Sequence, residues 1–166
     1  MENERTKFEA LLRRVNESET LKEVLKILSY AAMFVSAYAF FYGAVLLSLR
    51  EPLVGIGYIA TIVLPALLLL LLTRLIKAPR PCDLFDFYET KGKRGYSFPD
   101  LALFFAFASG TLILFVHFTL GLITLSLSLV LCATRTLLGR SFVRDVVAGG
   151  LLGIATSLIG YFLLIL

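Results

Sequence analysis

Long apolar runs separated by short charged segments constrain the fold of this chain more than any motif does. Hydrophobic residues make up 58% of its 166 residues and charged residues 17%, and its mean hydropathy is +0.87. A soluble domain of this size carries a larger share of charge. A bilayer has a hydrocarbon core about 30 Å thick, which takes roughly 20 apolar residues per helical span. The runs therefore predict a protein embedded in a membrane.

Five of these runs are long enough to be spans. Lipid cannot satisfy backbone polar groups, so each span is expected to be helical rather than extended. The sequence therefore predicts an all-α integral membrane protein, with five transmembrane helices in a bundle and an N-terminal amphipathic helix. The predicted spans are residues 25–49, 52–72, 98–116, 118–133 and 146–166.

The first 24 residues differ from the rest because acids and bases alternate around a few apolar side chains. Phe8, Leu11, Leu12 and Val15 fall on one helical face. Two interpretations stay open, an interfacial helix lying on the membrane and a solvated helical arm. Residues 20–23 fit a capping box that would start the first span. We therefore expect an N-terminal helix over residues 1–24 and a single membrane domain over 25–166.

The placement of charge predicts the topology. With five spans, the N-terminal arm and the loops 73–97 and 134–145 share one side, and they carry all of the 16 Lys and Arg residues except Arg50. The positive-inside rule places that side in the cytoplasm. The net charge of +4 then belongs to a face near anionic lipid, and the chain lacks the aromatic platform or basic helix of a nucleic-acid binder. We expect an integral protein of a bacterial or archaeal type of plasma membrane.

Several of these cations stand at the ends of predicted spans. Arg74, Lys77 and Arg80 follow the second span, and Arg135 follows the fourth. Positive charge in such a place holds a phosphate well. The third span, expected to open at residues 98–99, would add backbone N–H groups to the same anion site. The alternative is that these cations only anchor the spans at the interface.

Three segments of the chain have a spacing that is typical of one enzyme family. They are residues 73–81, which end in Arg80-Pro81, residues 95–102, and residues 134–145, which contain Arg135, Ser141 and Asp145. Here the chain resembles the type-2 phosphatidic acid phosphatase family of integral membrane lipid phosphatases. That family carries a lysine, six residues and Arg-Pro; then Pro-Ser-X-His; then Ser-Arg, five residues, a histidine, three residues and an aspartate. The likeness covers roughly residues 50–166.

The resemblance implies a phosphohistidine mechanism that needs no metal and no other cofactor. In the family, one histidine attacks phosphorus, an aspartate orients it, and a second histidine protonates the leaving group. The matching positions here hold Ser141, Asp145 and Ala102. Alanine carries no proton, and Ser141 has no base unless Asp145 serves, although a carboxylate is a poor base for a hydroxyl. We therefore expect little or no hydrolysis.

Two other residues bear on that expectation. Asp100 replaces a small hydroxyl residue of the family motif and would repel phosphate if it were ionised near the site. His117, the one histidine of the chain, lies at the turn between the third and fourth spans, which the topology places on the opposite face. It is therefore expected to be an interfacial residue and not a catalyst.

The sequence thus leaves a choice of functions. The first is a non-catalytic binder of a phosphorylated lipid head group, acting as a sensor, a carrier or a regulatory partner, with the phosphate held by Lys77, Arg80, Arg135 and Arg74. The alternative is an active phosphatase on phosphatidate, phosphatidylglycerophosphate or polyprenyl pyrophosphate, with Ser141 and Asp145 as an altered catalytic pair. A third and weaker option is movement of lipid between leaflets.

Other chemistry-bearing groups give no further site. Asp83, Asp86 and Glu89 could attract a divalent cation, but acids alternating with aromatic rings are more typical of solvated charges, so we predict no metal site. Cys82 and Cys132 indicate neither a disulfide framework nor a zinc site.

The last span carries a stripe of small residues. Gly149, Gly153 and Ser157 recur every four residues, a pattern that lets helices approach closely. The partner could be another span or a second subunit in a homo- or hetero-oligomer, and we expect packing within the chain.

Overall fold

A bundle of helices accounts for nearly the whole chain. The structure is a computed structural model that describes residues 2–81 and 96–165, so Cys82 and the acidic stretch at 83–89 lie outside the described residues. The helices are α1 (Glu2–Glu17), α2 (Glu19–Arg50), α3 (Pro52–Ile76), α5 (Leu101–Val116), α6 (Phe118–Leu137) and α7 (Val143–Ile165). The predicted all-α fold is confirmed.

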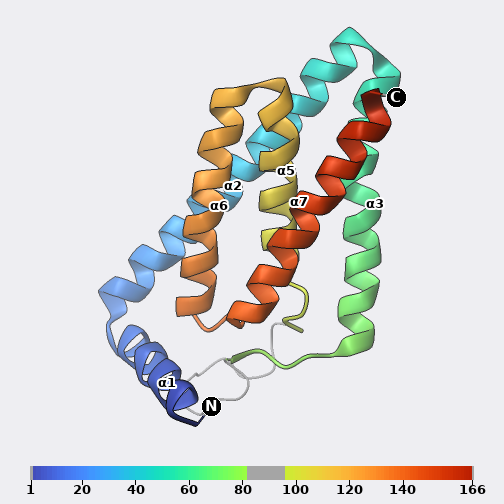
Figure 1. The fold of residues 1–166 in the computed structure, drawn as a ribbon. Coiled ribbons are helices and arrows are strands. Elements are labelled where there is room, and N and C mark those ends of the chain that lie inside the picture. The colour runs from blue at the N-terminus through green and yellow to red at the C-terminus, as the bar shows by residue number, and fades with distance from the viewer. Residues whose placement is uncertain (1, 82–95, 166) are drawn as a thin grey trace.

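Helices α2, α3, α5, α6 and α7 run side by side and alternate in direction (Figure 1). Among the described residues, α2, α3, α6 and α7 are long and apolar enough to cross a membrane, whereas α5 is a shorter apolar helix of 16 residues. The N-terminus, the end of α3 and the α6–α7 junction lie at one end of the bundle, and the C-terminus lies at the other. This matches the predicted five-span path of the chain.

Helix α5 is the centre of the bundle and packs against α2, α3, α6 and α7. Its Leu103 and Phe104 are fully buried. The small residues of α7 permit this packing, because a Cβ atom on Gly149 or Gly153 would clash with backbone carbonyls of the chain at Asp100 and Phe104. Ser157 Oγ, one turn further, donates to the Ala108 carbonyl at 2.9 Å. The small-residue stripe therefore packs within the chain, as expected.

Helix α1 lies across the end of the bundle that holds the N-terminus (Figure 1). Leu12 and Val15 are buried where α1 contacts α2 and α6, and the Phe8 ring lies 6.4 Å from that of Phe142. Leu11, predicted to share that face, is 47% exposed. The helix is therefore amphipathic, and its apolar face packs on the protein itself.

Helix α2 begins earlier than predicted. Its N-cap is Ser18, whose Oγ accepts a hydrogen bond from the Leu21 amide at 3.4 Å. The predicted capping box at residues 20–23 is therefore wrong in position, because those residues already lie inside α2. Serine is among the best N-cap residues, and it stands two positions ahead of the predicted cap.

Three further boundaries differ from the prediction at the end of the bundle that holds the N-terminus. Helix α5 starts at Leu101 with Asp100 as its N-cap, and not at residues 98–99, where a cis peptide joins Phe98 to Pro99. Helix α6 ends later than predicted and helix α7 begins earlier, so only residues 138–142 connect them. This brings Arg135 into the last turn of α6 and Asp145 into the first turn of α7.

His117 caps two helices at the other end of the bundle. It is the C-cap of α5 and the N-cap of α6, and its Nδ1 accepts from the Leu120 amide at 3.3 Å. Its ring meets that of Tyr42 edge-on at 6.1 Å. The junction lies at the end opposite the α6–α7 connection (Figure 1), as the topology predicted.

Candidate functional site

Asp100 is the central residue of the polar cluster at the start of α5. Its side chain is fully buried, and its Oδ1 accepts hydrogen bonds from the amides of Ala102 at 3.0 Å and Leu103 at 3.2 Å. Aspartate is a strong N-cap because it satisfies amides that have no partner in the helix. The amides that we expected to bind a phosphate are thus satisfied by the chain's own carboxylate.

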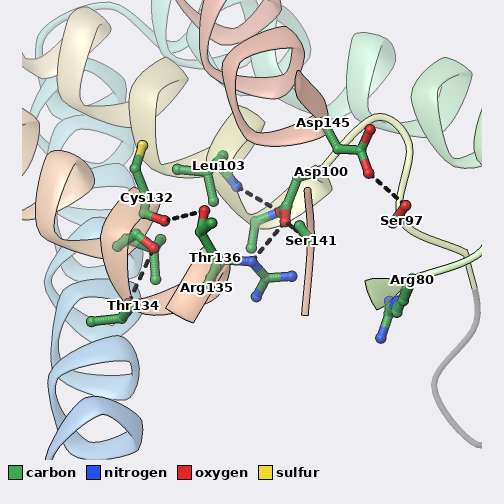
Figure 2. Close-up of polar contacts among 12 residues, drawn as sticks. Arg80, Ser97, Asp100, Leu103, Cys132, Thr134, Arg135, Thr136, Ser141 and Asp145 are labelled. Atoms are coloured by element: carbon green, nitrogen blue, oxygen red, sulfur yellow. Dashed lines mark hydrogen bonds and ion pairs between the residues drawn. The ribbon is translucent and has the colours of Figure 1, made fainter. Parts of the chain in front are cut away.

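The other oxygen of this carboxylate contacts two more donors (Figure 2). Arg135 Nε donates to Asp100 Oδ2 at 2.7 Å, and the Ser141 hydroxyl donates to the same oxygen. A carboxylate offers about four lone-pair sites, and the four donors from α5, α6 and the α6–α7 connection use them. Asp100 is therefore an anion held within the protein, with no acceptor capacity left for a substrate proton or a metal ion.

Asp145 forms a second buried carboxylate cluster beside the first. Its Oδ2 accepts from the Ser97 hydroxyl at 2.6 Å and its Oδ1 from Arg144 Nε at 3.3 Å. Its backbone carbonyl accepts from the Asp100 amide at 3.2 Å. These bonds tie the segment before α5 to the first turn of α7. Asp145 is thereby engaged in holding the site together.

The predicted catalytic pair is not brought together by these contacts. Ser141 is 1% exposed and donates to Asp100, whereas Asp145 accepts from Ser97 and Arg144. Ser97 lies in the second of the three segments but was not among the predicted site residues. Its pairing with Asp145 had no local signal, since 48 residues separate the two.

A pocket of about 390 Å³ opens beside the Asp100 cluster. Its lining contains Arg80, Arg135, Asp100, Ser141 and Ala102 together with apolar side chains. The guanidinium group of Arg80 donates to the Tyr96 carbonyl, from Nε at 3.4 Å and from Nη2 at 3.2 Å. Figure 2 shows Arg80 and Arg135 coming from different segments, the first from the chain after α3 and the second from α6.

The structure thus brings together two of the four predicted phosphate-binding cations. Arg74 and Lys77 are exposed at the end of α3, where Lys77 is the C-cap in a left-handed conformation with φ 51°, and neither lines the pocket.

Within residues 2–81 and 96–165, no group of three His, Cys, Asp or Glu residues is arranged to hold a metal ion. The two buried carboxylates of the site are occupied by donors from the protein. The arrangement can therefore bind an anion at its arginines, and the described part of the chain offers no metal centre beside them.

The fold is similar to that of solved membrane proteins. The crystal structure of Aquifex aeolicus LpxE matches with a TM-score of 0.68 and 23% sequence identity, over 92% of this chain and 93% of that one. The structure of a transmembrane PAP2 type phosphatidylglycerolphosphate phosphatase from Bacillus subtilis gives a TM-score of 0.46 and 21% identity, over 94% and 91% of the two chains. No family model matches the sequence, and no curated protein matches it either. The chain therefore shares its fold with Aquifex aeolicus LpxE.

Proposed function

We propose that this protein binds the phosphorylated head group of a membrane lipid and does not hydrolyse it. The observation that carries the proposal is the pocket itself, in which Arg80 and Arg135 face one cavity of about 390 Å³. Arginine is suited to phosphate because its planar guanidinium group donates several hydrogen bonds in a fixed geometry.

The rest of the lining favours a lipid over a soluble phosphate. Met33, Leu101 and Phe105 contribute apolar surface to the same pocket. The pocket lies at the end of a bundle in which α2, α3, α6 and α7 are of membrane-spanning length. A ligand with an anionic group and an apolar body matches both parts of the lining. Arg74 and Lys77, exposed nearby in sequence, would add attraction for an anionic lipid surface.

The absence of hydrolysis follows from the two positions where the resembled family has histidines. Ala102 and Ser141 both line the pocket, so a bound phosphate would meet a methyl group and a hydroxyl. The Ser141 hydroxyl donates to Asp100, and a carboxylate is a poor base for a hydroxyl. Neither a proton donor for the leaving group nor an activated nucleophile is present at these positions.

This binding activity suits a sensor, a carrier or a regulatory partner of an active enzyme. In each role the lipid must be recognised and left intact. The charge placement further favours a site on the cytoplasmic face of the membrane.

The test combines phosphate release with binding. Purified protein in neutral detergent is offered phosphatidate, phosphatidylglycerophosphate and polyprenyl pyrophosphate, and binding is followed by calorimetry. We expect no phosphate release, and a loss of affinity of about 10- to 100-fold in Arg80→Gln, the size of one charge-assisted hydrogen bond. Arg50→Gln is the matched control, because Arg50 ends α2 at the opposite end of the bundle.

Two results would overturn the proposal. Equal affinity in Arg80→Gln, Arg135→Ala and the wild type would show that these cations do not hold the ligand. Phosphate release that disappears in Arg135→Ala would instead establish the alternative, an active phosphatase with an altered nucleophile.

A further inference from the structure

We infer that the pocket selects a singly charged phosphodiester head group over a doubly charged phosphomonoester, because Asp100 supplies a fixed negative charge inside it. This inference rests on the proposed function and specifies its ligand. The charged side chains among the described residues that line the pocket are Arg80, Arg135 and Asp100. Two positive charges and one negative charge leave a net charge of +1.

Asp100 already holds the position that a phosphate oxygen would take at such a site. A phosphate at a helix N-terminus accepts from backbone amides and from a nearby arginine. Asp100 accepts from the first amides of α5, from Arg135 at 2.7 Å and from the Ser141 hydroxyl. The carboxylate is therefore an internal anion, and a ligand must bind beside it.

The carboxylate cannot readily move out of the way. Its Oδ1 caps α5, and its backbone amide donates to the Asp145 carbonyl. The backbone carbonyl of Asp100 lies against Gly149 of α7, where no side chain would fit. The backbone at Asp100 is thus fixed by the packing of α5 on α7, and hydrogen bonds from α5, Arg135 and Ser141 hold the negative charge in the lining.

The charge of the ligand then decides how well it fits. A phosphomonoester carries about −1.5 to −2 charges at pH 7, whereas a phosphodiester carries one. A diester neutralises the net charge of +1, but a monoester brings an excess negative charge next to Asp100. Like charges brought together without water between them oppose binding and act as an element of specificity.

The first measurement uses the wild-type protein and two short-chain lipids in neutral detergent micelles at pH 7.5. Titration calorimetry compares dihexanoyl phosphatidylglycerol, a diester, with dihexanoyl phosphatidate, a monoester of the same chain length. We expect the diester to bind more tightly. The neutral micelle keeps the surface charge of the two experiments the same.

The second measurement removes the negative charge. In Asp100→Asn we expect the affinity for phosphatidate to rise by about tenfold, while that for phosphatidylglycerol changes far less. Asparagine preserves the N-cap of α5, and Asp100→Ser, which also preserves it, is the second variant if the first does not fold. Glu19→Gln is the matched control, since Glu19 lies in the first turn of α2 and does not line the pocket.

These measurements distinguish the selectivity for a diester from the binding function itself. Tighter binding of phosphatidate by the wild type, with no gain in Asp100→Asn or Asp100→Ser, would overturn the selectivity for a diester and leave the binding function standing. No binding of either lipid, in the wild type and in the variants, would overturn the binding function itself.

Discussion

Replacing Arg135 with methionine removes the cation that contacts the buried Asp100 carboxylate, at 2.7 Å from Nε to Oδ2. The Asp100 side chain is 0% exposed and that of Arg135 is 13% exposed. Breaking a buried pair by removing one partner costs about 3–5 kcal/mol because an uncompensated charge remains. We expect the free energy of unfolding of Arg135→Met to fall by about that amount.

Removing the anion of this pair should lower the free energy of unfolding less than removing the cation does. Asp100→Asn keeps the cap on α5 and leaves Arg135, which lines the pocket and can be hydrated there. We expect a loss of about 1.5–3 kcal/mol, the value of a hydrogen bond to a charged group. The double variant should be more stable than the sum of the single changes predicts, with a coupling energy of about 2 kcal/mol.

Tyrosine fluorescence during unfolding by SDS in mixed micelles measures these energies. The sequence has no Trp, and Tyr58 is buried in the core beside Phe40, with 5.9 Å between the ring centroids. Arg140→Met is the control, because Arg140 stacks over the Tyr30 ring and should contribute at most about 1 kcal/mol. A coupling energy below about 0.5 kcal/mol would refute the pairing of Asp100 with Arg135.

Three further outcomes are expected. Ser97→Ala removes a hydrogen bond to a buried carboxylate and should cost about 1–3 kcal/mol in the same unfolding assay, while Ser126→Ala, at an exposed hydroxyl bonded within its own helix, should change stability by less than about 0.5 kcal/mol. Gly149→Ala should destabilise the protein more than Gly150→Ala, because the first methyl group would meet backbone and the second the edge of a phenylalanine ring at 3.0 Å; equal midpoints would contradict the packing of α5 on α7. In intact cells, an impermeant thiol reagent should leave Cys82 unlabelled until lysis, and labelling before lysis would overturn the cytoplasmic orientation inferred from charge.

The membrane-spanning architecture was predictable because each residue has its own hydrophobicity, and adding these values along a run identifies a span. Helix ends were less predictable, since they depend on single caps. The sequence pattern placed the start of α5 at residues 98–99, but the structure begins it after Asp100. The signal was present all the same, because an aspartate directly before an apolar run is a typical N-cap.

The candidate site was only partly predictable. Spacing within the three segments located Arg80 and Arg135, and both line the pocket. The partners of the carboxylates were not predictable, because they depend on how distant segments pack. Asp100 and Ser141 are 41 residues apart in the chain, and Ser97 and Asp145 are 48 apart. Such contacts are set by three-dimensional packing and leave no periodic trace in the sequence.

The short length of α5 gives the site a dependence on bilayer thickness. Its 16 residues extend about 24 Å, less than the hydrocarbon core of about 30 Å, whereas α2 has 32 residues and α3 has 25. If His117 lies at one surface, we expect Asp100 to lie several ångströms inside the opposite boundary of the core. A lipid head group reaches it only if the membrane thins locally or the lipid sinks, and both carry a cost that grows with the mismatch. We expect a lipid head group to bind in this pocket more readily in bilayers of shorter acyl chains. Membrane thickness would then be part of what the protein recognises.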